Sequence, residues 1–216
     1  MTSRMALLRR ALRLETLTIA WNVVEAVIAI GAGWIAGSVA LVGFGLDSTI
    51  ETIAASALFL RLRAEMKGAD EEETEAHEKR ALRIVGVTFL LLALYILYEA
   101  GSTLWFREPP QPSRIGIALA ALSLVAMPFL AWAKYRTGEA LKSRALIADA
   151  KETIACSYLS LTLLIGLGAN ALWGWWWADP VAALAMLPWV VREGFEALEE
   201  SSADCATEDS VRELDA

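Results

Sequence analysis

The sequence contains few of the side chains on which disulfide-rich scaffolds, nucleic-acid binders and many enzymes depend. It has only two cysteines, Cys156 and Cys205, which are too few and too far apart for a disulfide framework. Its one histidine, His77, we interpret as a surface residue rather than a metal ligand. Only 21% of the residues are charged, and the net charge of -7 argues against nucleic acid as a partner. No pairing of a nucleophile with a base is visible, so we expect no enzymatic activity.

Apolar residues are abundant instead. They make up 56% of the 216 residues, and the mean hydropathy is +0.46, which exceeds what a soluble domain needs. A helix crosses the hydrocarbon core of a bilayer with about 20 apolar residues. Runs of about this length occur six times, at residues 17–36, 39–60, 84–105, 115–133, 145–171 and 175–191. The sequence therefore predicts an all-α membrane protein, a bundle of six transmembrane helices.

The basic residues predict the orientation of this bundle. All but Arg107, Arg114 and Lys151 of the 19 Lys and Arg lie in segments that six spans would place on one side of the membrane. Those segments are the N-terminal arm, a long charged loop at 61–83, a basic loop at 134–144 and the C-terminal region. The positive-inside rule then places both the N- and the C-terminus in the cytoplasm.

Two of the predicted spans carry ionisable side chains that are costly in a membrane. A charged residue at the centre of a membrane helix costs on the order of 2.5–3.5 kcal/mol. Asp47 and Glu51 lie four residues apart in the second span, and Glu152 and Cys156 lie four residues apart in the fifth. Each pair therefore lies on one helical face. Counted from the cytoplasmic ends of their helices at 1.5 Å per residue, the depths of the two pairs agree to about 3 Å.

These four side chains predict a site for a divalent metal cation. Three carboxylates and one thiol from two facing helices suit a small cation in tetrahedral geometry, for which zinc is the common occupant. Cadmium, cobalt, iron and manganese are alternative occupants of the site, whereas the thiol disfavours magnesium and calcium. In the alternative interpretation, these groups pair with one another or with Lys151 and hold the bundle together. Cys156 by itself is equally well explained as a small buried apolar residue.

Further ionisable residues are candidates for accessory roles. Glu25 and Lys151 have similar predicted depths, and we expect an ion pair between them. In the alternatives, Lys151 repels cations from the empty site or extends toward the interface. Asp149 we interpret as a helix-packing residue, with an entrance ligand as the alternative. Asp179 followed by Pro180 is typical of an N-cap and the first residue of a helix, here the last one.

Several motifs occur together in a characteristic order between residues 14 and 200. They are Asn22 and Glu25 in the first span, Gly37-Ser38-Val39-Ala40-Leu41, Asp47-x-x-x-Glu51, the segment from Ser143 to Ala150, and the segment from Trp177 to Ala183. At these residues the chain resembles the cation diffusion facilitator family of divalent-metal transporters. The resemblance implies six transmembrane helices, a homodimer, no permanent cofactor, and export of zinc or a similar ion from the cytoplasm against inward proton flow.

The chain also departs from the pattern of that family. The family's fifth helix usually carries His-x-x-x-Asp or Asp-x-x-x-Asp, where this chain has Glu152-x-x-x-Cys156. The departure affects both the identity of the metal and the coupling to protons. Because no site histidine is present, we expect Glu51 and Glu152 to carry the exchanged protons.

The expected domain organisation is a cation-efflux transmembrane domain at residues 1–196 and a short, polar, acidic tail at 197–216. The family's soluble C-terminal domain is expected to be absent. A second functional hypothesis is a transporter scaffold that has lost its chemistry and acts as a membrane interaction or regulatory protein. In either case we expect a multi-pass protein, in a bacterial inner membrane.

Overall fold

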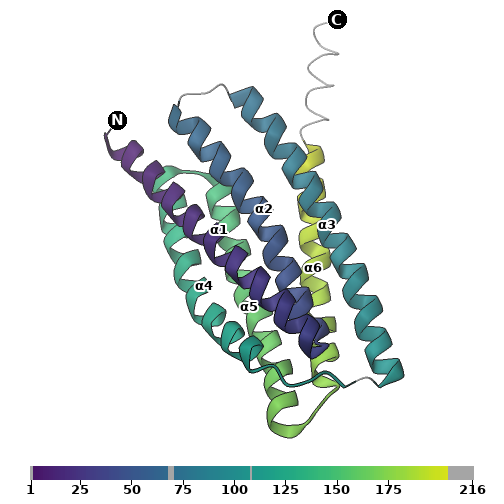
Figure 1. Ribbon diagram of the computed structural model, residues 1–216. Coiled ribbons are helices and arrows are strands. Elements are labelled where there is room, and N and C mark those ends of the chain that lie inside the picture. Colours follow the sequence, from purple (N-terminus) through teal and green to yellow (C-terminus); the bar gives the residue numbers. More distant parts are fainter. Residues whose placement is uncertain (1, 68–70, 108, 204–216) are drawn as a thin grey trace, which may run out of the picture.

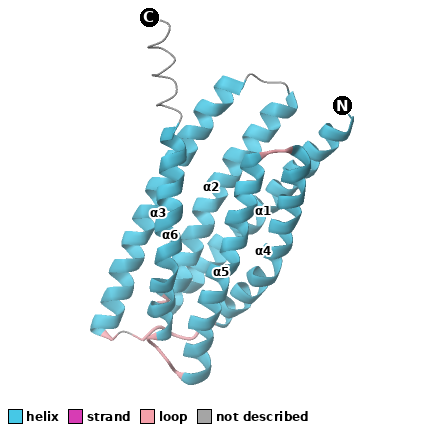
Figure 2. Cartoon of the chain, turned by 180° about the vertical axis from the view of Figure 1, so that it is seen from behind, coloured by secondary structure: helices cyan, strands magenta, loops and turns pink. Residues whose placement is uncertain are grey.

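The computed structural model describes residues 2–67, 71–107 and 109–203, and these residues form six α-helices and no strand. The helices are α1 (Thr2–Ala36), α2 (Val39–Lys67), α3 (Glu71–Phe106), α4 (Arg114–Leu141), α5 (Arg144–Trp173) and α6 (Ala178–Ala203). They run up and down one bundle, as Figures 1 and 2 show. The predicted all-α, six-helix bundle is confirmed.

The helices are longer than the predicted spans. The charged segment 61–83 was expected to be a loop, but α2 continues to Lys67 and α3 begins at Glu71. The basic segment 134–144 is likewise helical up to Leu141. These two loop predictions are therefore wrong, because a helix that leaves the hydrocarbon core can continue into water. The side chain of His77, which was predicted to lie on the surface, is not among the side chains that the structure describes. At the other end, α6 includes residues 197–203 of the predicted tail.

The start of α6 binds the start of α2. Gly37, in the turn between α1 and α2, has a φ of +65°, a conformation that favours glycine. Ser38 Oγ accepts a hydrogen bond from the backbone N–H of Leu41 (3.1 Å) and donates one to Asp179 Oδ1 (2.5 Å). Asp179 Oδ2 also accepts from the backbone N–H of Ala40 (3.4 Å). The prediction that Asp179 caps its own helix is wrong: its carboxylate lies at the positive end of the α2 dipole instead.

The helices pack in three close pairs around a central element. α1 packs along α2, α4 along α5, and α3 along α6, while α2 also contacts α3, α5 and α6. Small residues allow this close approach. A Cβ atom added to Gly45 of α2 would lie 2.8 Å from a side-chain carbon of Ile30 in α1. The central position of α2 places its buried polar residues within reach of both α5 and α6.

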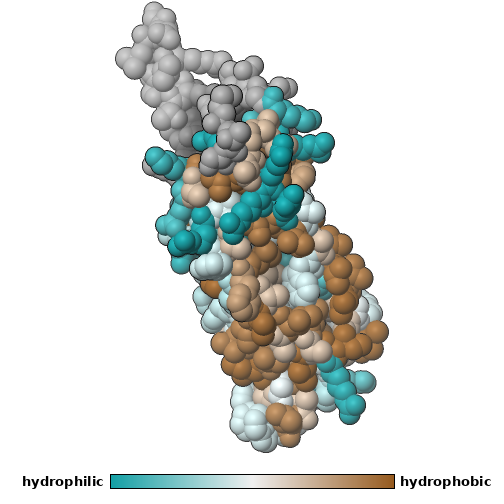
Figure 3. Space-filling model, turned by 90° about the vertical axis from the view of Figure 1, so that its left-hand side faces the viewer, coloured by the Kyte–Doolittle hydropathy of each residue, from teal (hydrophilic) through white to brown (hydrophobic). Residues whose placement is uncertain are grey.

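The outer surface of the bundle is apolar over much of its length. Large apolar side chains such as Val27, Leu91 and Phe129 are exposed, and Figure 3 shows a broad hydrophobic surface next to a hydrophilic end. Helices α1 to α5 are long and apolar enough to cross a membrane. In α6 the apolar stretch is interrupted by Asp179, Arg192 and Glu193. The chain is a multi-pass membrane protein.

Both the first residue of α1 and the last described residue of α6 lie at one end of the bundle, together with the end of α2, the start of α3 and the α4–α5 connection (Figure 1). The α1–α2 turn, the end of α3, the start of α4 and the α5–α6 connection lie at the opposite end. The basic segments that six spans were predicted to place on one side of the membrane thus lie at the same end of the bundle. The assignment of that end to the cytoplasm stays a prediction.

Candidate metal centre

Helices α2 and α5 bring three of the predicted ligands together in the interior of the bundle. One ligand atom each from Asp47, Glu51 and Cys156 lies within 4.8 Å of the other two. The thiol of Cys156 donates a hydrogen bond to Glu51 Oε1. Asp47 and Cys156 are each only 3% exposed. The three side chains that the i, i+4 spacing and the depth count placed at one level therefore lie next to one another.

A polar residue from α1 contacts the same group. Asn22, which is fully buried, donates from Nδ2 to Glu51 Oε2 at 3.1 Å. Its amide oxygen, Oδ1, is buried and has no hydrogen-bond partner among the described residues. An unsatisfied buried acceptor is unusual and calls for an explanation such as a water or an ion. A cation or a metal-bound water next to Glu51 would provide one.

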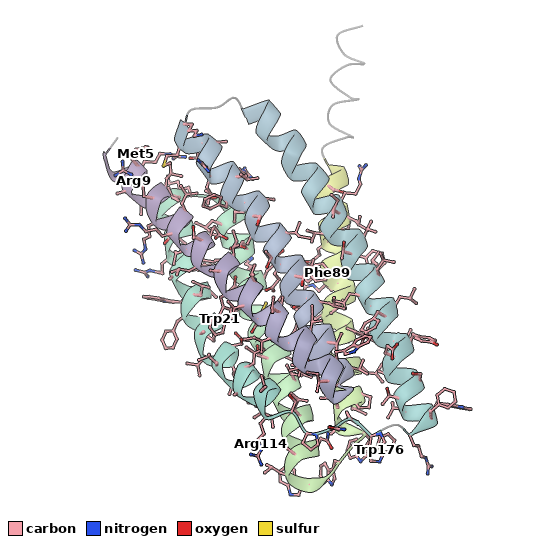
Figure 4. All side chains as sticks on the ribbon, in the orientation of Figure 1. Met5, Arg9, Trp21, Phe89, Arg114 and Trp176 are labelled. Carbon is pink, nitrogen blue, oxygen red and sulfur yellow. The ribbon has the colours of Figure 1, made fainter. Side chains whose placement is uncertain are left out.

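The fourth predicted ligand, Glu152, lies beside this group rather than within it. A cavity of about 10 Å³, room for about one water molecule, is lined by Asp47, Glu51, Ala54, Val85, Phe89, Glu152, Trp189 and Glu193. Glu152 therefore shares a cavity with Asp47 and Glu51 but is not one of the three mutually close groups. In Figure 4, Phe89 marks the depth of this cavity, between Arg9 near one end of the bundle and Trp176 at the other.

Glu193 is the residue of this cavity that the sequence reasoning missed. It lies on α6 and is 7% exposed. The predicted sixth span ends at residue 191, two residues before Glu193. Its neighbour Arg192 differs from it, since Arg192 is exposed and binds Glu196 at 2.6 Å. Asp179 is buried at the other end of α6, and Glu193 follows it by fourteen residues, which is nearly four full helical turns. The two residues therefore lie close to the same face of α6, a spacing from which Glu193 could have been predicted to be buried.

The expected ion pair between Glu25 and Lys151 is contradicted. Glu25 is buried, and it accepts hydrogen bonds from Ser48 (3.1 Å) on α2 and from Ser123 on α4. Lys151 is exposed on α5, and the ion pairs among the described residues do not join it to Glu25. Similar depth was not enough to pair them, because the two side chains leave their helices in different directions.

A different lysine forms the buried ion cluster. Lys134 of α4 has no exposed side-chain surface and lies 3.3 Å from Glu15 Oε2 and 2.6 Å from Asp149 Oδ2. Its Nζ atom is also 3.3 Å from the hydroxyl of Thr153. This agrees with the packing role expected for Asp149. The sequence analysis missed Lys134 because it placed residue 134 in a loop.

A profile of the cation efflux transmembrane domain matches residues 16–204, which is most of the chain and includes α2 to α6 and the larger part of α1. The protein belongs to the cation efflux family. The resemblance predicted from the motifs is therefore confirmed at the level of the family.

Known members of the cation efflux family are similar to this chain over its helical part. An uncharacterized transporter of Synechocystis is 31% identical over 73% of this chain and 52% of its own length. The manganese efflux system protein MneS of Bacillus subtilis is 26% identical over 92% of the chain and 69% of its own length. A cadmium, cobalt and zinc/H(+)-K(+) antiporter of Bacillus velezensis is 23% identical over 84% and 57%, respectively. The chain thus spans about half to two thirds of the length of these relatives.

The donor set of this cation efflux protein has a definite chemistry. Carboxylates and a thiol bind divalent transition metals, and they must lose any bound proton before they can act as ligands. Binding of a metal ion at Asp47, Glu51 and Cys156 would therefore release the proton that the thiol now shares with Glu51. Metal binding and proton release are coupled at such a site by its chemistry alone.

Proposed function

We propose that the protein transports a divalent metal cation, zinc first among them, out of the cytoplasm in exchange for protons. The proposed ligands are Asp47, Glu51, Glu152 and Cys156. The observation that carries the proposal is the group of two carboxylates and one thiol, with ligand atoms within 4.8 Å of one another, in the interior of a helix bundle. The family relatives named for manganese and for cadmium, cobalt and zinc support a divalent cation as the cargo.

The charge around the cavity supports a cation as the ligand. The cavity wall contains four carboxylates and no Lys, Arg or His. Carboxylates that crowd one buried cavity repel each other, and protons or a bound cation relieve this repulsion. A site that alternates between these two states performs the exchange that an antiporter needs.

The proposed cycle follows from access to this site from one side at a time. A metal ion from the cytoplasm displaces protons from Glu51, Glu152 and Cys156, and protons from the other side later displace the metal. Alternating access of this kind is produced by helices that rock around a fixed midplane site. We further propose a homodimer that associates through its membrane helices, in a bacterial inner membrane with both ends of the helical domain in the cytoplasm.

Transport by purified protein in liposomes tests the proposal. Zinc entry is followed with a zinc-sensitive dye inside the vesicles, with and without an imposed pH gradient. Asp47→Ala is expected to abolish flux, whereas Glu139→Ala, which removes an exposed carboxylate of α4, leaves flux at the wild-type level. Equal flux from the wild type and Asp47→Ala, or none from the wild type for any divalent ion, would refute the assignment. Flux that ignores the pH gradient would refute the proton exchange alone.

A further inference from the structure

Glu193 faces the same cavity as the proposed ligands, from a helix that supplies none of them. Asp47 and Glu51 come from α2 and Glu152 from α5, whereas Glu193 comes from α6. It is 7% exposed, which is far less than Glu196 one turn later, whose side chain is 47% exposed. Glu193 thus brings a buried carboxylate to the cavity from a third helix.

The position of Glu193 is fixed by a close approach of α6 to α3. A Cβ atom added to Gly194 would lie 3.0 Å from the side chain of Leu90 and 3.2 Å from that of Phe89. One added to Gly86 would lie 2.8 Å from the carbonyl oxygen of Gly194. The two helices therefore touch through one glycine of each, Gly86 of α3 and Gly194 of α6, directly after Glu193. This contact sets the height and rotation of α6 where Glu193 enters the cavity.

The neighbouring cation is held away from the cavity. The guanidinium of Arg192 binds Glu196 at 2.6 Å and lies 5.6 Å from the centre of the Trp189 ring, on the exposed side of α6. Trp189 itself lines the cavity, whereas Arg192 does not. The wall of the cavity is therefore acidic although Arg192 directly precedes Glu193 in the sequence.

We propose that Glu193 is an additional carboxylate ligand that adapts the site to ions of higher coordination number. The set of Asp47, Glu51, Glu152 and Cys156 supplies four donors, which suits zinc. A further carboxylate, together with the buried Asn22 amide oxygen that has no partner among the described residues, adds oxygen donors. Oxygen-rich spheres of five or six ligands suit Mn²⁺, whereas a tetrahedral site with sulfur suits Zn²⁺. Glu193 thus decides how well the protein handles Mn²⁺ relative to Zn²⁺.

This inference rests on the proposed function, and one binding experiment separates the two. Purified protein in detergent is titrated with Mn²⁺, whose free form is measured by electron paramagnetic resonance, and bound Mn²⁺ is then displaced with Zn²⁺. Glu193→Gln is expected to weaken Mn²⁺ binding about tenfold or more and Zn²⁺ binding much less. The matched control is Glu196→Gln, which removes an exposed carboxylate from the same helix and is expected to change neither affinity.

Each outcome has one meaning. An unchanged ratio of Mn²⁺ to Zn²⁺ affinity in Glu193→Gln overturns the inference and leaves the proposed function intact. Absence of binding of both metals to the wild type overturns the proposed function itself. If Glu193→Gln does not fold, Glu193→Asp retains the charge and withdraws the carboxylate by one methylene. That variant is also expected to lose Mn²⁺ affinity more than Zn²⁺ affinity, and equal losses would again overturn the inference.

Discussion

Replacement of Lys134 by methionine is expected to destabilise the protein by about 3–5 kcal/mol, the usual cost of removing one partner from a buried ion pair. Methionine has nearly the same length and shape, so the change removes the charge and little packing. Lys134 lies 2.6 Å from Asp149 and 3.3 Å from Glu15. At an effective dielectric constant of about 20, these contacts correspond to roughly 6 and 5 kcal/mol of gross attraction.

The net effect is smaller than this sum because the lysine also regains its hydration when the protein unfolds. The carboxylates left behind determine the remainder. Glu15 has no exposed side-chain surface, and one of its oxygens has no partner among the described residues even with Lys134 present. Asp149 is 13% exposed and retains some access to water. We therefore expect Glu15 to account for most of the loss.

The free energy of unfolding is measured by SDS titration in mixed micelles, followed by circular dichroism. Lys151→Met removes an exposed charge from α5 and is expected to change the stability by less than about 0.5 kcal/mol. The triple variant Lys134→Met, Glu15→Gln, Asp149→Asn removes all three charges and is expected to recover most of the loss. A loss below about 1 kcal/mol for Lys134→Met, or a triple variant as unstable as the single one, would refute the reasoning.

Two further predictions concern the helix ends and the metal ligands. Asp179→Ala removes the carboxylate that binds Ser38 and the backbone of Ala40 at the start of α2; it is expected to cost about 1–2 kcal/mol in the same titration. An unchanged midpoint would mean that these bonds contribute nothing net. Cys156→Ser replaces a soft ligand with a hard one and is expected to weaken Cd²⁺ binding, measured by calorimetry, more than Mn²⁺ binding. Equal effects on both ions would exclude a metal–sulfur contact.

The sequence was a good guide where a helical period alone decides the outcome. The spacing of Asp47 and Glu51 places both carboxylates on one face of α2, and the depth count brought Cys156 of α5 to the same level. Hydropathy likewise located all six helices. These results depend on 3.6 residues per turn and 1.5 Å per residue, which hold for any helix.

Rotation about the helix axis could not be derived in the same way. Glu152 is one turn from Cys156, yet only Cys156 lies within 4.8 Å of both α2 carboxylates, while Glu152 faces the adjoining cavity toward α6. Four residues turn a helix by about 40° past a full circle. That offset separates the two side chains once α5 is packed against both α2 and α6. The crossing of the helices, which depends on contacts such as Gly166 against Ala182, determines which of them faces α2.

The missed residues share one physical cause. The predicted fourth span ends directly before Lys134, and the sixth ends directly before Arg192. A charged residue marks the edge of the membrane only where its side chain would otherwise meet lipid. Lys134 has two carboxylate partners inside the bundle, and Glu193 faces a cavity between helices. Asp179 and Glu193 are also two of the three charges that interrupt the apolar stretch of α6, and both are buried in protein. A charged residue near the end of a membrane helix therefore indicates which face of the helix points into the bundle. It does not by itself show where the helix leaves the membrane.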